Sequence, residues 1–288
     1  MSIRIGTGEG LSVQLTTPEL NTRTVAIING GTQGLGEAVA RKLAADGAEG
    51  LLLCGRSVDR GTTLAAELSE QGTPSAFVEV DVADVTALPT IVDACVERFG
   101  TVNGLVNVAA LTTRANLFND TPDHFDRMMA INVRAPYFLI SAVARVMIEQ
   151  GVHGSIVNVG STSAHGGQGK LSAYSASKGA LAVLTKNLAF ALMRHNIRVN
   201  QVNPGWMETE SEHRIQMDED GAPENWLELA GPGRALGRLL QPWEVANTIA
   251  HCLSPVSGLM TGNIIDVDQS VQGAGGPPMP GPEDTVQP

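Results

Sequence analysis

The sequence has few cysteines, few basic residues and no long apolar run, and each shortage excludes a class of protein. Its three cysteines, Cys54, Cys95 and Cys252, are odd in number, far apart and set in apolar surroundings. This pattern predicts buried reduced thiols and argues against a disulfide framework or a zinc site. Because 19 Lys and Arg face 30 Asp and Glu, the net charge is −11, and neither nucleic acid nor anionic lipid is expected as a partner.

Signals for export, membrane insertion and metal binding are also scarce. Residues 1–20 contain no apolar signal core, and no run approaches the ~18 apolar residues of a membrane helix. The six histidines show no metal-ligand spacing such as His-Glu-x-x-His. We therefore expect a cytoplasmic protein with no membrane partner and no metal. With 288 residues, of which 43% are apolar, the chain is long enough to bury the core of one large α/β domain.

From Thr24 onward, short aliphatic runs alternate with segments of helical period, as in βαβ units of a parallel sheet. Strands are predicted at Thr24–Ile28, Gly50–Cys54, Ala76–Val80, Gly104–Val108, Ser155–Val159, Arg198–Val202 and Asn263–Val267. Helices are predicted at Leu35–Asp46, Arg60–Gln71, Val85–Phe99, Pro122–Gln150, Ala173–His195 and Pro242–Leu253. Strands without polar alternation need helices on both faces. The expected fold class is α/β: a doubly wound, Rossmann-like parallel sheet of seven strands in a three-layer sandwich.

Two segments lie outside this pattern. Residues 1–23 precede the first strand and are predicted to form an N-terminal arm. Residues 272–288 form a tail rich in Gly and Pro, a composition typical of disorder. Residues 24–271 are therefore expected to form a single domain.

A glycine-rich turn follows the first strand and leads directly into a helix, reading Asn29-Gly30-Gly31-Thr32-Gln33-Gly34-Leu35-Gly36. Glycines let backbone N–H groups approach a pyrophosphate, which the positive end of the following helix also favours. This turn predicts a dinucleotide site that includes Gly30, Thr32, Gln33, Gly34, Leu35 and Gly36. The alternative is a flexible turn that only allows tight packing of helix against strand.

The end of the second strand bears on which dinucleotide binds. It reads Leu53-Cys54-Gly55-Arg56-Ser57 and lacks the acidic residue that an NAD enzyme presents to the ribose 2′-hydroxyl. Arg56 would pair with a 2′-phosphate, which favours NADP as the cofactor and leaves NAD as the alternative. An arginine here is otherwise a solvated loop residue.

A serine, a tyrosine and a lysine form the candidate catalytic set. Tyr174 and Lys178 are four residues apart at the start of a predicted helix, so their side chains share one face. A tyrosine with an ordinary pKa of about 10 needs a lower value to act as a base near neutral pH, and an adjacent ammonium plus a positive nicotinamide ring would lower it. Ser161 follows the fifth strand and would donate a hydrogen bond to the substrate oxygen.

This order of features resembles the short-chain dehydrogenase/reductase family. The family's glycine turn has the same spacing as Gly30, Gly34 and Gly36 here. The family's serine lies thirteen residues before its tyrosine, as Ser161 does before Tyr174 (174 − 161 = 13). The resemblance covers residues 24–271 and implies a nicotinamide-dependent oxidoreductase that interconverts an alcohol and a carbonyl. In that family the tyrosine exchanges the proton, the serine steadies the oxyanion, and the lysine holds the ribose and lowers the tyrosine pKa.

The resemblance also implies roles for residues elsewhere in the chain. It implies that Asp81 and Val82 lie beside adenine, that Asn132 is a fourth catalytic residue which bends its helix and holds a water, and that cofactor contacts come from Asn107, Ala109, Tyr174, Lys178, Pro204, Gly205, Met207 and Thr209. Departures occur at Asn29, where a Thr is usual, at Val108 and Ala110 beside Asn107, and at Gln33, which is often basic in NADP-using members. The Val108 and Ala110 changes put one sheet-stabilising hydrogen bond in doubt.

Substrate choice is expected to lie in a lid at about residues 206–236, a polar and acidic segment that favours a small sugar, polyol or similar polar substrate. The acidic run Asp218-Glu219-Asp220 is alternatively a solvated face. Candidate substrate residues are Ser161, Ser163, His165, Tyr174 and Trp206; His165 is equally explained as a solvated loop residue. The resemblance further implies a homo-oligomer, a tetramer or dimer formed through the long helices at Pro122–Gln150 and Ala173–His195.

Two other functions are compatible with parts of the sequence. Ser175-x-x-Lys178 has the spacing of the acylating motif of penicillin-binding enzymes, but no Lys-Thr-Gly partner is present and the glycine turn is left unexplained. A catalytically weak NADP-binding regulator on the same fold is the second alternative, because Val108 and Ala110 depart from the family pattern.

Overall fold

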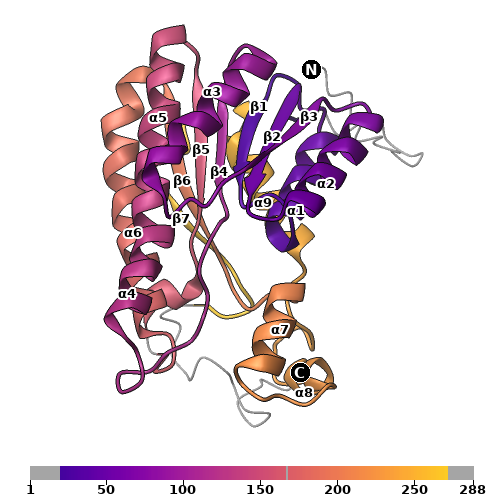
Figure 1. Ribbon diagram of the computed structural model, residues 1–288, viewed down its shortest axis with the longest axis vertical. Helices are drawn as coiled ribbons and strands as arrows, with labels where there is room; N and C mark the ends of the chain where they lie inside the picture. The colour runs from indigo at the N-terminus through magenta and orange to yellow at the C-terminus, as the bar shows by residue number, and fades with distance from the viewer. Residues whose placement is uncertain (1–19, 167, 272–288) are drawn as a thin grey trace, which may run out of the picture.

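Seven parallel strands form one sheet in the order β3-β2-β1-β4-β5-β6-β7 (Figure 1). The computed structural model describes residues 20–166 and 168–271. The strands are β1 (Val25–Asn29), β2 (Gly50–Gly55), β3 (Ser75–Glu79), β4 (Gly104–Asn107), β5 (Gly154–Val159), β6 (Ile197–Pro204) and β7 (Ile264–Val267). All seven predicted strands are confirmed, with boundaries shifted by one or two residues. The predicted tail and residues 1–19 of the predicted arm lie outside the described residues.

Helices cover both faces of this sheet and make three layers (Figure 1). Helices α1 (Gly34–Ala45), α2 (Val58–Glu70) and α9 (Pro242–Leu253) enclose one core, and α3 (Leu88–Phe99), α5 (Ala135–Gln150) and α6 (Ser172–Leu192) enclose the other. Strand β2 is apolar throughout because both of its faces are buried: Leu52 faces one core, while Leu51 and Leu53 face the opposite one. The doubly wound α/β fold is thereby confirmed.

The three cysteines lie inside these cores as predicted. Cys54, Cys95 and Cys252 are all buried and free. Leu20 to Arg23, the described end of the predicted arm, lie against the domain: the buried Asn21 amide donates to Asp46 at 3.2 Å and to the Ala250 carbonyl at 3.4 Å. The ordered domain therefore begins before β1.

The long predicted helix from Pro122 to Gln150 is one helix interrupted by a wide turn. Helix α4 (Pro122–Met129) continues through a π-helical turn at Ala130–Arg134 into α5. Thr121 caps the start, as its side-chain oxygen accepts from the His124 amide at 3.2 Å. By length and composition this helix could cross a membrane, yet half of its most apolar stretch is buried in the fold. Packing against the sheet buries one side of this helix, whereas Tyr137 and Phe138 on α5 remain exposed.

The predicted lid contains two helices that were not predicted from the sequence. They are α7 (Glu210–Asp218) and α8 (Trp226–Ala230), and they lie beyond the carboxyl ends of the strands (Figure 1). The start of α7 had a recognisable signal, because Thr209-x-x-Glu212 matches a capping box. Thr209 does cap the helix by accepting from the Glu212 amide at 3.1 Å, but the Glu212 side chain turns elsewhere.

A row of buried amides links three strands and one helix beneath the carboxyl edge of the sheet. The Asn29 amide donates to Asn107 at 3.3 Å, Asn107 donates to Asn158 at 2.9 Å, and Asn158 donates to the Thr185 hydroxyl of α6 at 2.9 Å. Asn107 thus bonds across the sheet on both sides although its neighbours are Val108 and Ala110. These bonds come from the retained Asn107, whereas the side chains of Val108 and Ala110 have no donor or acceptor and add none.

Because buried amides without partners are costly, Asn158→Ala should lower the free energy of unfolding by roughly 2–4 kcal/mol. The substitution leaves the Asn107 amide without its acceptor and the Thr185 hydroxyl without its donor. Urea denaturation measures the change, with Gln71→Ala, at an exposed amide, as the control. Equal stability of the two variants would contradict a structural role for the row.

Candidate active site

A cavity of about 1070 Å³ lies at the carboxyl ends of the strands. Its lining comes from the ends of β1, β2, β4, β5 and β6, from the start of α6 and from α7. The strand order reverses between β1 and β4, and open α/β sheets bind ligands at such a switch point. The topology therefore brings distant parts of the sequence to one site.

The glycine turn forms the floor of one end of the cavity. Gly30 has φ +83°, and a Cβ there would lie 2.5 Å from the Ala109 nitrogen. A Cβ on Gly36 would lie 1.9 Å from the Gly30 carbonyl oxygen. Both positions therefore require glycine, and the turn presents its backbone at the start of α1, where a pyrophosphate is favoured. These residues fit a dinucleotide.

Arginines flank the end of β2. Arg56 lines the cavity with an exposed side chain that forms no hydrogen bond within the described residues. Arg60 donates to Gln33 at 3.0 Å and makes a bidentate pair with Glu210 of α7 at 2.7 Å. Asp81 accepts from the Ala83 amide and from Arg127, and these two bonds lower its pKa. Arg56 thus lines this end of the cavity beside Asp81 and Glu210, whose charges are paired with Arg127 and Arg60.

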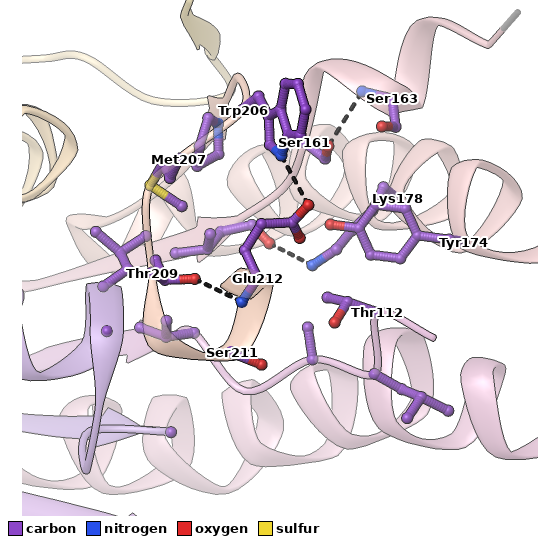
Figure 2. A pocket seen from close by; sticks show the side chains of 18 of the residues that line it. Thr112, Ser161, Ser163, Tyr174, Lys178, Trp206, Met207, Thr209, Ser211 and Glu212 are labelled. Atoms are coloured by element: carbon purple, nitrogen blue, oxygen red, sulfur yellow. Dashed lines mark hydrogen bonds between the residues drawn. The ribbon is translucent and has the colours of Figure 1, made fainter. Parts of the chain in front are cut away.

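Ser161, Tyr174 and Lys178 line the middle of the same cavity (Figure 2). Ser161 follows β5, and its hydroxyl accepts from the Ser163 amide at 3.1 Å. Tyr174 and Lys178 lie on successive turns of α6, with the Lys178 ammonium 5.7 Å from the centre of the Tyr174 ring. The Lys178 side chain is 2% exposed and donates to the Val159 carbonyl at 2.7 Å.

The protein groups alone do not make Tyr174 acidic. Burial raises its pKa to about 12 and outweighs the lowering effect of the hydrogen bond with Ser161, while the charge of Glu212 raises the pKa further. Burial also lowers the pKa of Lys178 to about 8, which weakens it as a fixed positive charge. Of the two sources predicted to lower the Tyr174 pKa, the neighbouring ammonium is therefore insufficient.

Asn132 lies in the π-helical turn and does not line the cavity. Its amide accepts from the Leu111 amide at 2.7 Å and donates to the Leu111 carbonyl and the Ser177 hydroxyl, both at 3.0 Å. The residue joins the segment after β4 to α6. The helix distortion that the family resemblance implies is present, since π-turns widen a helix locally.

Two residues near the candidate catalytic set lie outside the lining: His165, a candidate substrate residue whose alternative was a solvated loop position, and Ser175, whose acylating motif was already disfavoured. His165 is not among the residues that line the cavity. Its Nε2 lies 2.9 Å from the carboxylate of Asp266, a residue of β7. The turn Thr162–His165 directs it away from the cavity. Ser175, the serine of the alternative acylating motif, is likewise not a lining residue, because its place on α6 turns it to another face.

Most predicted cofactor residues surround this cavity. Those lining it are Gly30, Thr32, Gln33, Gly34, Leu35, Arg56, Asp81, Val82, Ala109, Tyr174, Lys178, Pro204, Gly205, Met207 and Thr209. Gly36 and Asn107 lie behind the lining instead, where they shape the turn and the sheet edge. Of the predicted substrate residues, Ser161, Ser163, Tyr174 and Trp206 line it.

Glu212 of α7 is the functional candidate that the sequence prediction missed. Its carboxylate is 16% exposed, and its Oε1 accepts from Arg114 and Trp206 at 2.7 Å and from Gln216 at 2.8 Å. Arg114 also pairs with Asp220, and its backbone N–H donates to Glu219 at 3.2 Å. The acidic run at 218–220 is therefore only partly the solvated face considered above, because two of its carboxylates bind Arg114.

Comparison with known proteins gives a consistent result. A family model described as enoyl-(acyl carrier protein) reductase matches residues 30–271. A galactitol 2-dehydrogenase from Agrobacterium fabrum is 34% identical, over 65% of this chain and 71% of its own. A 3alpha-hydroxysteroid dehydrogenase from Mediterraneibacter gnavus is 34% identical, over 85% and 95%. The solved structure of an actinorhodin polyketide ketoreductase variant with NADPH has a TM-score of 0.80 at 30% identity, covering 86% of this chain and 96% of its own.

The negative charge of Glu212 makes a prediction about Tyr174. Because that charge raises the Tyr174 pKa, Glu212→Gln should lower it, and the phenol should begin to ionise at lower pH, by roughly one unit. NMR of ring-labelled tyrosine measures the onset, with Tyr137→Phe used to assign the second of the two tyrosines. Asp218→Asn removes a charge from the exposed side of α7 and serves as the control. An unchanged onset in Glu212→Gln would show that the two groups do not interact.

Proposed function

The chain belongs to the short-chain dehydrogenase/reductase family, oxidoreductases acting on CH–OH groups, and on that premise we propose that it interconverts an alcohol and a carbonyl on a small polyhydroxylated substrate with NADP. The observation that carries this proposal is the meeting of Ser161, Tyr174 and Lys178 in one cavity with the glycine turn. Neither the acylating alternative nor a simple binding module explains both parts of this cavity.

The proposed chemistry assigns one task to each side chain. A bound nicotinamide supplies the acceptor or donor of the hydride. In the oxidation direction the Tyr174 oxygen takes the hydroxyl proton, while the Ser161 hydroxyl donates a hydrogen bond to the substrate oxygen as it becomes a carbonyl. In reduction Tyr174 returns the proton to that oxygen.

Lys178 is proposed to bind the cofactor ribose and to stabilise the ionised form of Tyr174. One of its three N–H donors is used by the Val159 carbonyl, which leaves two for the ribose hydroxyls and the catalytic phenol. Its pKa of about 8 keeps it mainly protonated at neutral pH. The cation of an oxidised nicotinamide would supply the remaining charge that favours the phenolate.

The preference for NADP rests on Arg56. Its side chain is exposed at the end of β2, lines the cavity, and has no acidic partner within hydrogen-bonding distance in the described part of the chain. A guanidinium in that state suits a 2′-phosphate better than a neutral ribose. Glu210 neutralises the neighbouring Arg60, which leaves Arg56 as the cation that selects the phosphate.

The proposal of a polyhydroxylated substrate rests on the lid. The relatives named above act on substrates as different as galactitol and a hydroxysteroid, so sequence similarity does not indicate which class of substrate this protein uses. Polar side chains from the lid and its surroundings line the cavity around Tyr174: Arg114, Gln168, Ser211, Glu212 and Gln216. Such a lining favours hydroxyl groups over a steroid or an acyl chain.

We further propose a cytoplasmic homo-oligomer, a dimer or tetramer. The three free thiols suit a reducing compartment. Helices α5 and α6 lie next to each other on one side of the molecule (Figure 1) and expose large apolar side chains, among them Tyr137, Phe138, Val183 and Phe190. An exposed apolar face of this kind is typical of a subunit interface.

Removing the phenol should abolish turnover but not cofactor binding. Tyr174→Phe eliminates the group that exchanges the proton, and general acid/base catalysis of this kind contributes roughly 10²–10⁴-fold. Absorbance of the reduced cofactor measures turnover with polyols, sugars and ketones, and nucleotide titration measures binding. If Tyr174→Phe still bound the cofactor and left every cellular effect intact, the alternative of an NADP-binding regulator would replace the proposed enzyme, whereas turnover at the wild-type rate would exclude Tyr174 as the acid/base.

Reversing the charge at the end of β2 should reverse the cofactor preference. Arg56→Asp removes the partner of the 2′-phosphate and adds an acceptor for the ribose 2′-hydroxyl, so kcat/KM should fall for NADP and rise for NAD. The ratio of the two kcat/KM values is the measurement, and Arg23→Asp, at an exposed position before β1, is the control. A ratio that stays at the wild-type value would exclude Arg56 as the selecting residue.

A further inference from the structure

Glu212 has one carboxylate oxygen fully engaged and the other available. Three donors from three different parts of the chain, Arg114, Trp206 and Gln216, all bind Oε1. Among the residues that the structure describes, no donor forms a hydrogen bond with Oε2. A partly buried carboxylate loses solvation, and hydrogen bonds are needed to offset that loss. Here the bonds fix the direction of the group while one acceptor remains open to the cavity.

The donor from Trp206 is itself held in place. The Arg234 guanidinium lies 4.6 Å from the Trp206 ring centre, and Trp226 stacks on the same ring at 5.8 Å. The Trp226 indole N–H donates in turn to His213 at 2.8 Å. The carboxylate of Glu212 is therefore pre-organised by packing as well as by hydrogen bonds.

The available oxygen is on the catalytic side of the cavity. Figure 2 shows the Glu212 carboxylate reaching from α7 toward the hydroxyls of Tyr174 and Ser161. Glu212, Tyr174 and Ser161 all line this cavity. A substrate whose reacting oxygen contacts Tyr174 and Ser161 would place the neighbouring carbon beside Glu212.

A fixed carboxylate at this position selects by charge and by hydrogen bonding. An ionised carboxylate only accepts hydrogen bonds, so its substrate partner has to be a donor. Asp220 pairs with Arg114 and also with Lys170, at 3.4 Å, so these three groups and Glu212 together carry no net charge, and the anionic group open to the cavity here is the Glu212 Oε2. A carboxylate or phosphate on the neighbouring carbon would be repelled, whereas a hydroxyl would be bound.

We propose that Glu212 is a specificity-determining residue that accepts a hydrogen bond from a hydroxyl next to the reacting carbon, so that the substrates are uncharged α-hydroxy ketones and the corresponding vicinal diols. This inference rests on the proposed function and narrows its substrate class. If Glu212 only fastened α7 to the segment that carries Arg114, its loss would affect all substrates equally.

A matched set of ketones separates these roles. Acetoin carries a hydroxyl next to its carbonyl, butanone lacks it, and acetoacetate replaces it with an anionic group. Each is reduced with NADPH by wild-type protein, Glu212→Gln and the control Asp218→Asn, and kcat/KM is measured. Comparing the acetoin-to-butanone ratio between proteins cancels the intrinsic reactivity of the two ketones.

In Glu212→Gln the acetoin-to-butanone ratio should fall on the order of 10- to 100-fold below wild type, because a hydrogen bond to a charged group is lost. In Asp218→Asn the ratio should not change. Trp206→Phe keeps the carboxylate and its Arg114 pair but removes the indole donor, so it should lower the ratio by a smaller factor. It also provides the test if thermal unfolding shows that Glu212→Gln does not fold.

Other outcomes would overturn the inference in distinct ways. An unchanged acetoin-to-butanone ratio in Glu212→Gln would show that Glu212 only stabilises the position of α7. A wild-type preference for acetoacetate, or for aminoacetone over hydroxyacetone, would assign the site to an anionic or a cationic neighbouring group. If the protein turned over none of these ketones and no larger polyol or sugar with either cofactor, that result would instead contradict the proposed function itself.

Discussion

The hydrogen bond from the Lys178 ammonium to the Val159 carbonyl is the constraint on which the rest of the site depends. It joins the second turn of α6 to the last residue of β5, at a distance of 2.7 Å. Ser161 follows two residues after that carbonyl, and Tyr174 lies one helical turn before that ammonium. A single bond to a buried charge thus fixes the serine and the tyrosine relative to each other.

Burial gives this arrangement its chemical character. It raises the pKa of Tyr174 to about 12 and lowers that of Lys178 to about 8, so both groups resist the charged forms that catalysis requires. The site is therefore poorly suited to proton transfer until another positive charge joins it. In the proposed chemistry an oxidised nicotinamide would supply that charge, and the charge of Glu212 makes it more necessary because it also disfavours the phenolate.

Two clusters of ionic contacts lie at different ends of the cavity. Near β2 the exposed Arg56 faces the nucleotide end, and the Arg60–Glu210 pair connects α2 to α7 across it. Near Tyr174 the Arg114–Glu212 and Arg114–Asp220 pairs connect α7 to the segment after β4. Helix α7 thus takes part in both clusters, and its position decides which charges face the cofactor and which face the substrate.

The sequence by itself determined the fold and the identity of most site residues. Parallel strands buried on both faces leave continuous apolar runs such as Leu51-Leu52-Leu53, and close backbone approach at Gly30 and Gly36 admits only glycine, so both features are legible locally. Tyr174 and Lys178 were identifiable because a helix brings residues four apart together. These patterns depend on neighbours in the chain, which the sequence contains.

Only the tertiary structure decided the contacts between distant segments. The capping-box pattern at Thr209 would have predicted the start of α7, but not that the Glu212 side chain leaves the helix end to meet Arg114, 98 residues away. The tertiary structure also placed His165 against Asp266 instead of the cavity, and it buried Tyr174, which raises the pKa that an adjacent ammonium and a nicotinamide ring were predicted to lower. Desolvation and long-range pairing depend on what packs around a group, and no local pattern in the sequence records that environment.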